Sequence, residues 1–145
     1  MTSGLQSEST YPPEEFEPVA RWVLDAPEQL AGLRAGLTEK LAEAGTHYTD
    51  GLTGVADKMV LVATELATNA IVHALPPTVV QLLKTEDEFV LDVVDHTPDE
   101  VPELSLGRPA GEGGLGLQIA LRMALDVGWF TEGSAKHVWA RFERQ

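Results

Sequence analysis

The chain has 145 residues, of which 43% are hydrophobic, and its 10 Lys and Arg against 23 Asp and Glu give a formal net charge of −13. Such an acidic chain repels nucleic-acid backbones and anionic lipid headgroups, so we expect neither direct nucleic-acid binding nor membrane binding. It has no cysteine, which excludes disulfides and thiol chemistry, and no membrane-length apolar run or signal peptide is evident, so we expect a cytoplasmic protein.

The first residues differ in composition from the rest of the chain. Residues 1–17 are polar and acidic and include two consecutive prolines. We expect them to form a disordered tail, because they offer little apolar surface to bury. The remaining residues, 18–145, have the length of one domain, and the sequence predicts a single domain there.

Hydrophobic patterning and Gly or Pro punctuation predict the elements of this domain. Pro27 can start a helix whose leucines recur every three to four residues, and Pro76 ends the next one. Alternating apolar residues predict the strands. In chain order we expect a strand at 19–24, helices at 27–44 and 55–74, strands at 79–83 and 89–94, a loop at 95–113, a helix at 115–125 and strands at 127–131 and 136–142. This order indicates an α+β sandwich with helices on one face of a mixed sheet.

The helix at 55–74 carries two polar stripes. One begins with Asp57 and is expected to face solvent. The other contains Glu65, Asn69 and His73 at i, i+4 and i+8, with apolar side chains on both sides. A carboxylate, an amide and an imidazole within an apolar border are costly to bury unless they face a polar cavity. The pattern favours a site, and the alternative is a solvated or internally paired stripe.

Two later segments also have features of binding sites. Asp95 ends an apolar strand, where it could accept a hydrogen bond from an amino group or form an ordinary Asx turn. The glycine-rich stretch 111–116 directly precedes a predicted helix, whose free N–H groups favour a phosphate. Alone, that stretch could be a flexible linker, and it does not fit a Rossmann fingerprint because no buried strand precedes it.

In this order and spacing, the three segments resemble the boxes of the GHKL ATPase superfamily, which includes gyrase, Hsp90, histidine kinases and MutL. The run 65–74 is similar to the N box, Asp95 to the start of the G1 box and 113–117 to the G2 box. The branch most resembled is that of single-domain anti-sigma-factor kinases and related actinobacterial regulators, whose closing strand often carries Lys-x-Val-Trp-Ala, here 136–140. The resemblance covers about 18–143 and implies the Bergerat fold: a two-layer α/β sandwich whose mixed, mostly antiparallel sheet is covered on one face by about three helices.

The resemblance also implies a site for ATP or ADP with Mg²⁺. Glu65 would be the general base, Asn69 would hold Mg²⁺ that bridges the phosphates, and Asp95 would accept from the adenine amine. His73 would either line the site or be structural. The further nucleotide-binding residues would be Thr97, Arg108, Gly113, Gly114, Leu115, Gly116 and Leu117, with 97–112 as a lid that nucleotide orders.

The activity implied is a serine/threonine kinase that phosphorylates an anti-sigma-factor antagonist and sequesters a sigma factor, and homodimers are common among such regulators. Glu65 and Asn69 favour this reading, because a pure binder needs no base. Thr97 stands where the G1 box usually has Gly or another small residue. That departure favours the alternative, a non-catalytic module of the same fold that binds nucleotide or partners. A structural domain without nucleotide is the third reading.

Overall fold

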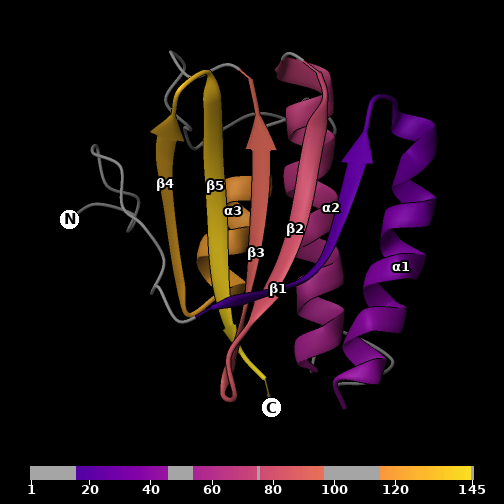
Figure 1. Ribbon diagram of the computed structural model, residues 1–145, viewed down its shortest axis with the longest axis vertical. Helices are drawn as coiled ribbons and strands as arrows, with labels where there is room; N and C mark the ends of the chain where they lie inside the picture. The colour runs from indigo at the N-terminus through magenta and orange to yellow at the C-terminus, as the bar shows by residue number, and fades with distance from the viewer. Residues whose placement is uncertain (1–15, 46–53, 75, 97–114, 145) are drawn as a thin grey trace.

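The computed structural model describes residues 16–45, 54–74, 76–96 and 115–144. They form a five-stranded sheet with three α-helices packed on one of its faces (Figure 1). In chain order, the elements are β1 (Glu17–Leu24), a 3₁₀ turn (Pro27–Gln29), α1 (Leu30–Glu43), α2 (Val55–His73), β2 (Thr78–Lys84), β3 (Glu88–Asp95), α3 (Leu115–Met123), β4 (Asp126–Glu132) and β5 (Ala135–Glu143). No helix within these ranges is both long and apolar enough to cross a membrane.

Every helix and strand predicted from the sequence is present, with two changes at the N-terminal side. β1 begins at Glu17, so the end of the expected tail already belongs to the sheet. The helix expected over 27–44 is divided, because its first three residues form the 3₁₀ turn. Residues 1–15 of the expected tail, and residues 46–53, lie outside the described part.

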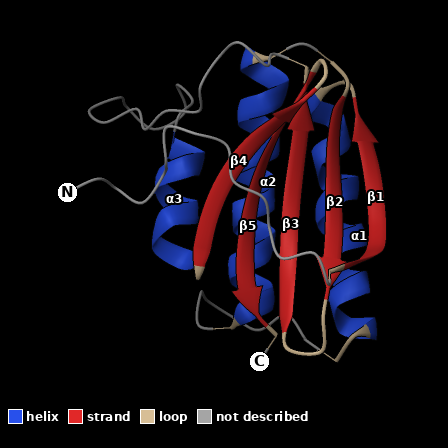
Figure 2. Cartoon of the chain, turned by 60° about the vertical axis from the view of Figure 1, so that its left-hand side comes forward, coloured by secondary structure: helices blue, strands red, loops and turns tan. Residues whose placement is uncertain are grey.

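The sheet is antiparallel throughout, in the order β1-β2-β3-β5-β4, where a mixed sheet was expected. The reason lies in the connection through α3. β3 and β4, on either side of that helix in the chain, run in the same direction, but β5 lies between them and pairs antiparallel with both (Figure 2). The crossover therefore creates no parallel pair.

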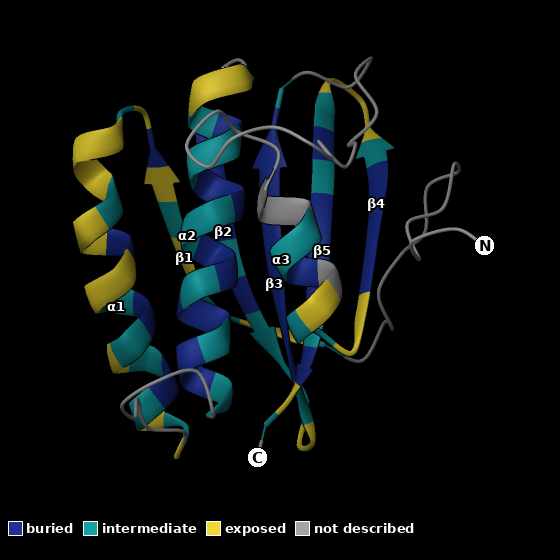
Figure 3. Ribbon diagram, turned by 180° about the vertical axis from the view of Figure 1, so that it is seen from behind, coloured by how far each residue is buried: buried dark blue, intermediate teal, exposed yellow. Residues whose placement is uncertain are grey.

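The three helices form one layer, with α2 between α1 and α3 (Figure 3). This position corrects the prediction for Asp57. Its side chain was expected in solvent, yet it is only 2% exposed. Because α2 has the sheet beneath it and a helix on each side, it buries most of its circumference. The hydroxyls of Thr64 and Thr68, on the same stripe, donate to backbone carbonyls one turn earlier.

The main core lies between the helices and the sheet. Leu33, Leu37 and Leu41 of α1 are almost completely buried, as their spacing predicts. Alternate side chains of the strands meet them, and on β3 these include Phe89 and Leu91. The same alternation places Asp95 on the helix-covered face, at the end of its strand.

Candidate functional site

A small cavity lies between α2 and the ends of β3 and β5, with a volume of about 50 Å³. Its lining residues come from three elements: Leu66, Asn69 and Ala70 from α2, Val93 and Asp95 from β3, and Lys136 and Val138 from β5. Two predicted site residues, Asn69 and Asp95, are therefore brought together although 26 positions separate them. The walls are otherwise mostly apolar, as in most sites that bind small molecules.

Asp95 faces this cavity because it continues the inward-facing series of β3. It is 5% exposed, and its Oδ2 lies 3.6 Å from Nζ of Lys136, which is 7% exposed. The two residues are direct partners in the β3–β5 register. The floor of the cavity thus carries a buried ion pair, with one hydrogen-bond acceptor group beside one donor group.

Lys136 is the cavity residue to which sequence reasoning gave no role. It was noted only as part of the closing-strand motif. The sequence pattern nevertheless indicates that this residue is buried: Val138, Ala140 and Phe142 alternate toward the core, and Lys136 lies on the same face of the strand. A lysine on the buried face of a strand is unusual enough to indicate a partner or a site.

Glu65 and His73 do not line the cavity. Glu65 lies one turn before Asn69 on α2 and is half-buried, whereas His73 is exposed at the helix end. The apolar border expected around the stripe is also open there, because Val72 is 62% exposed. Neither residue is among the described residues that line the cavity.

The glycine-rich region and the lid are only partly described. Thr97, Arg108, Gly113 and Gly114 lie outside the described residues, as does the rest of 97–112. The helix predicted to follow the glycines does begin at Leu115, and Gly116 and Leu117 are in its first turn. Its N-terminus is where backbone N–H groups would be available to a phosphate.

His96, the residue directly after Asp95, is held by a contact with the backbone. Nδ1 of its ring lies 3.1 Å from the carbonyl oxygen of Pro77. A carbonyl only accepts, so Nδ1 carries the proton and donates. This contact links the turn after β3 to the segment that follows α2, and so fixes the chain directly after Asp95.

A second polar group lies on the opposite face of the sheet. Nδ1 of His137 is 2.8 Å from Oδ2 of Asp92, and Gln81 donates to the same oxygen over 3.1 Å. The imidazole stacks on Phe130 with centroids 4.3 Å apart. Burial lowers the pKa of His137, but the hydrogen bond and charge of Asp92, with smaller effects of Glu132 and Asp95, raise that pKa overall above its ordinary value of 6.5. His137 is therefore a pH-sensitive contact outside the cavity.

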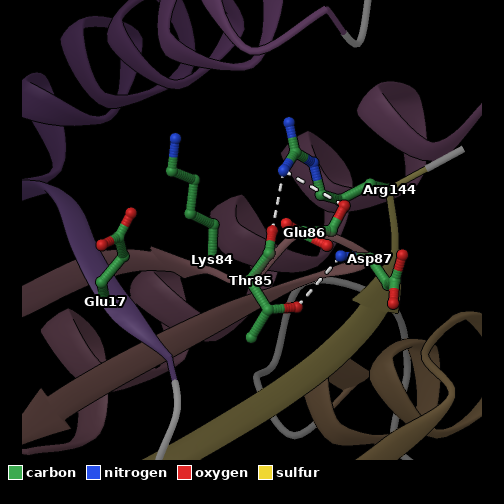
Figure 4. A pocket seen from close by; sticks show the side chains of 6 residues that line it. All are labelled: Glu17, Lys84, Thr85, Glu86, Asp87 and Arg144. Carbon is green, nitrogen blue, oxygen red and sulfur yellow. Dashed lines mark hydrogen bonds between the residues drawn. The ribbon is translucent and has the colours of Figure 1, made fainter.

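A larger depression of about 520 Å³ lies at the other end of the sheet, around Arg144 (Figure 4). The guanidinium of Arg144 donates to the carbonyl oxygens of Thr85, Glu86 and Ala44 over 2.7, 3.3 and 3.0 Å. It also lies 5.1 Å from the centroid of the Phe89 ring. The arginine thus fastens the end of β5 to the β2–β3 turn and the end of α1, which is a structural role.

The polar groups of the cavity have the chemistry to bind parts of a nucleotide with a magnesium ion. Asn69 offers an amide oxygen, of the kind Mg²⁺ prefers, and Asp95 offers an acceptor for an amino group. No group of three or more His, Asp or Glu in the described part of the chain could hold a metal ion by itself. A magnesium ion here would need further oxygen ligands from phosphates and water, in keeping with its usual binding.

Comparison with known proteins agrees with the fold described above. The crystal structure of the RsbU and RsbW domains of Rv1364c from Mycobacterium tuberculosis superposes with a TM-score of 0.58 at 17% identity, covering 85% of this chain. The alignment spans only 32% of that longer chain, and at this identity it shows the fold alone. A comparison with curated proteins finds no match. The sequence profile of the histidine kinase-like ATPase domain matches residues 23–142, and the chain therefore belongs to this family.

Proposed function

We propose that residues 18–145 form an ATP-binding domain that acts as a regulator of the anti-sigma-factor type. ATP or ADP would bind with Mg²⁺ at the cavity between α2, β3 and β5. The observation that carries this proposal is the convergence of Asn69 and Asp95 on one cavity, in a chain of the histidine kinase-like ATPase family. Family membership implies nucleotide binding, and the convergence supports this cavity as the part of the molecule where the nucleotide would bind.

Each residue would have a distinct task. Asp95, buried at the strand end, would accept from the adenine amine, and the first turn of α3 would donate backbone N–H groups to the phosphates. Asn69 would hold the magnesium ion, which supplies charge neutralisation to the triphosphate when bound. Glu65, outside the cavity on the same face of α2, would take the proton of a hydroxyl presented by a partner.

The reaction we propose is transfer of the γ-phosphoryl group to a serine or threonine of an anti-sigma-factor antagonist, with a sigma factor as the second partner. Support comes from the motif resemblance described above and from the position of Glu65. A general base for a protein substrate must be reachable from solvent, and a half-buried carboxylate satisfies this. Because ATP and sigma factors are cytoplasmic, this activity belongs to the cytoplasm.

One observation favours a second candidate, a non-catalytic module that binds nucleotide and partners. Glu65 does not line the cavity, so nothing in the described residues holds it against a bound phosphate. Binding and catalysis therefore need separate tests.

Calorimetric titration with Mg-ATP tests binding, and Asp95→Asn should weaken it because the amide carries no charge and one acceptor fewer. Phosphoryl transfer to an antagonist protein tests catalysis. Glu65→Gln should keep the affinity and abolish transfer, whereas Asn69→Ala should reduce both. Glu39→Gln, on the exposed side of α1, is the matched control and should change neither. If titration with millimolar Mg-ATP produces no heat of binding, the proposal of nucleotide binding is overturned. If the protein binds nucleotide but transfers no phosphoryl group, the non-catalytic module is the candidate function that remains.

A further inference from the structure

The ion pair at the floor of the cavity has a chemistry that its fold does not require. Lys136 and Asp95 are both more than nine-tenths buried, and the next residues on the same face of their strands, Val138 and Val93, belong to the apolar core. Burying two charges costs several kcal/mol per ion before their attraction is counted, so a pair of apolar residues would usually stabilise the fold as well. A buried pair that lines a cavity is therefore a candidate for function.

The two side chains offer complementary hydrogen-bond groups. A carboxylate only accepts, and the lysine ammonium carries three donors and no acceptor. The six-amino group of adenine is a donor flanked on each side by a ring nitrogen, N1 or N7, that accepts. An adenine whose amino group donates to Asp95 would have one of these ring nitrogens near Nζ of Lys136, which lies 3.6 Å from the same carboxylate.

Charge balance supports the same arrangement. The whole chain carries a net charge of −13, and Lys136 is the one cation among the described residues that line the cavity. A neutral base that replaced this cation would leave the carboxylate of Asp95 without its counter-ion in an apolar environment, which is costly. If the ammonium stays and donates to the base, both charged groups remain satisfied.

We propose that Lys136 is a base-reading residue of the nucleotide site: its ammonium group donates to the adenine ring nitrogen beside the amino group that Asp95 accepts. This inference rests on the proposed function and adds a specificity determinant to it. At about 50 Å³ the cavity has room for a few water molecules and not for a purine, so the flexible stem of the lysine must rearrange as adenine enters, while its ammonium group stays beside Asp95.

The test is a titration series with Mg-ATP, 1-deaza-ATP and 7-deaza-ATP, in which a C–H group replaces one or the other ring nitrogen. Wild-type protein should bind one analogue more weakly than ATP by on the order of 10-fold or more, the usual value of a hydrogen bond to a charged group. Lys136→Met should weaken ATP binding by a similar factor and then bind that analogue and ATP alike. Lys84→Met removes the same charge at the far end of the sheet and should retain the wild-type pattern.

The outcomes separate this inference from the function it extends. If wild-type protein binds all three nucleotides equally, the inference is overturned and nucleotide binding stands. If Lys136→Met weakens all three by the same factor, the lysine acts only through the structure and the inference also fails. If no nucleotide binds, the proposed function and the inference fall together. The wild-type series needs no variant, so it decides the question even where Lys136→Met does not fold, and Lys136→Gln then completes the comparison.

Discussion

The Asp95–Lys136 pair should cost stability when it is broken and cost little when it is replaced as a whole. The two side chains are 7% and 9% exposed, so each variant that removes one of them leaves the other charge in a nearly dry environment. For buried pairs this penalty is about 3–5 kcal/mol. Because single domains have a free energy of unfolding of roughly 5–15 kcal/mol, Lys136→Met alone should remove a large share of it.

The double variant Asp95→Leu/Lys136→Met removes both charges and fills the cavity with apolar atoms. It should recover most of the loss, to within about 1 kcal/mol of wild type or beyond it. Urea unfolding at pH 7, followed by the fluorescence of the buried Trp129 and Trp139, measures all four proteins. We expect the double variant to fold and to lose nucleotide binding.

Two results would refute this reasoning. If each single variant loses less than about 1 kcal/mol of unfolding free energy, the charge that remains is well solvated and the pair does not lie in a dry environment. A double variant whose loss equals the sum of the two single losses would mean that the residues do not interact. In either case, the pair would carry no stability cost that indicates a function.

Three further predictions concern the fold. Gly36→Ala should destabilise the protein, because a Cβ there would lie 2.7 Å from Nε1 of Trp22, whereas Gly32→Ala on the same helix meets nothing within 4 Å and should stabilise it by about 0.5–1 kcal/mol; thermal unfolding compares the two. His137→Gln should lower stability most below about pH 6.5, and progressively less as the pH rises through the pKa of the folded state. The reason is that the interactions that raise the pKa of His137 stabilise the folded state only while its imidazole is protonated. Urea unfolding between pH 5.5 and 8.5 measures the difference in stability between variant and wild type, and a difference that does not change with pH would contradict this prediction. Arg144→Lys should cost about 1–3 kcal/mol, because an ammonium cannot span three carbonyls, and hydrogen exchange should then increase at the end of α1; unchanged exchange would remove that structural role.

The sequence predicted the elements well because its periodicities are local. Leucines at helical spacing marked α1, alternating apolar residues marked β3 and β5, and a proline ended α2 near its observed end. The same local patterns placed Asn69 on an inward-facing stripe and Asp95 at a strand end. Their assignment to one nucleotide site came from the resemblance to the GHKL motifs.

The residues that sequence reasoning missed or misplaced depend on neighbours. Asp57 was expected in solvent, because the helical pattern cannot show that α2 lies between two other helices. Lys136 received no role, because its meaning depends on which strand pairs with β5 and in which register. For His73, expected either to line the site or to be structural, the structure shows an exposed helix end, and its role stays a prediction.

The sequence by itself determined the α+β class, the succession of strands and helices, and the family resemblance, since each of these rests on short-range pattern or on residues within one motif. The tertiary structure decided the strand order, with β5 between β3 and β4, and therefore the contact of Asp95 with Lys136 across 41 positions of the chain. The physical reason is that periodicity specifies the buried face of an element, whereas the neighbour of that face is chosen by the packing of the whole core.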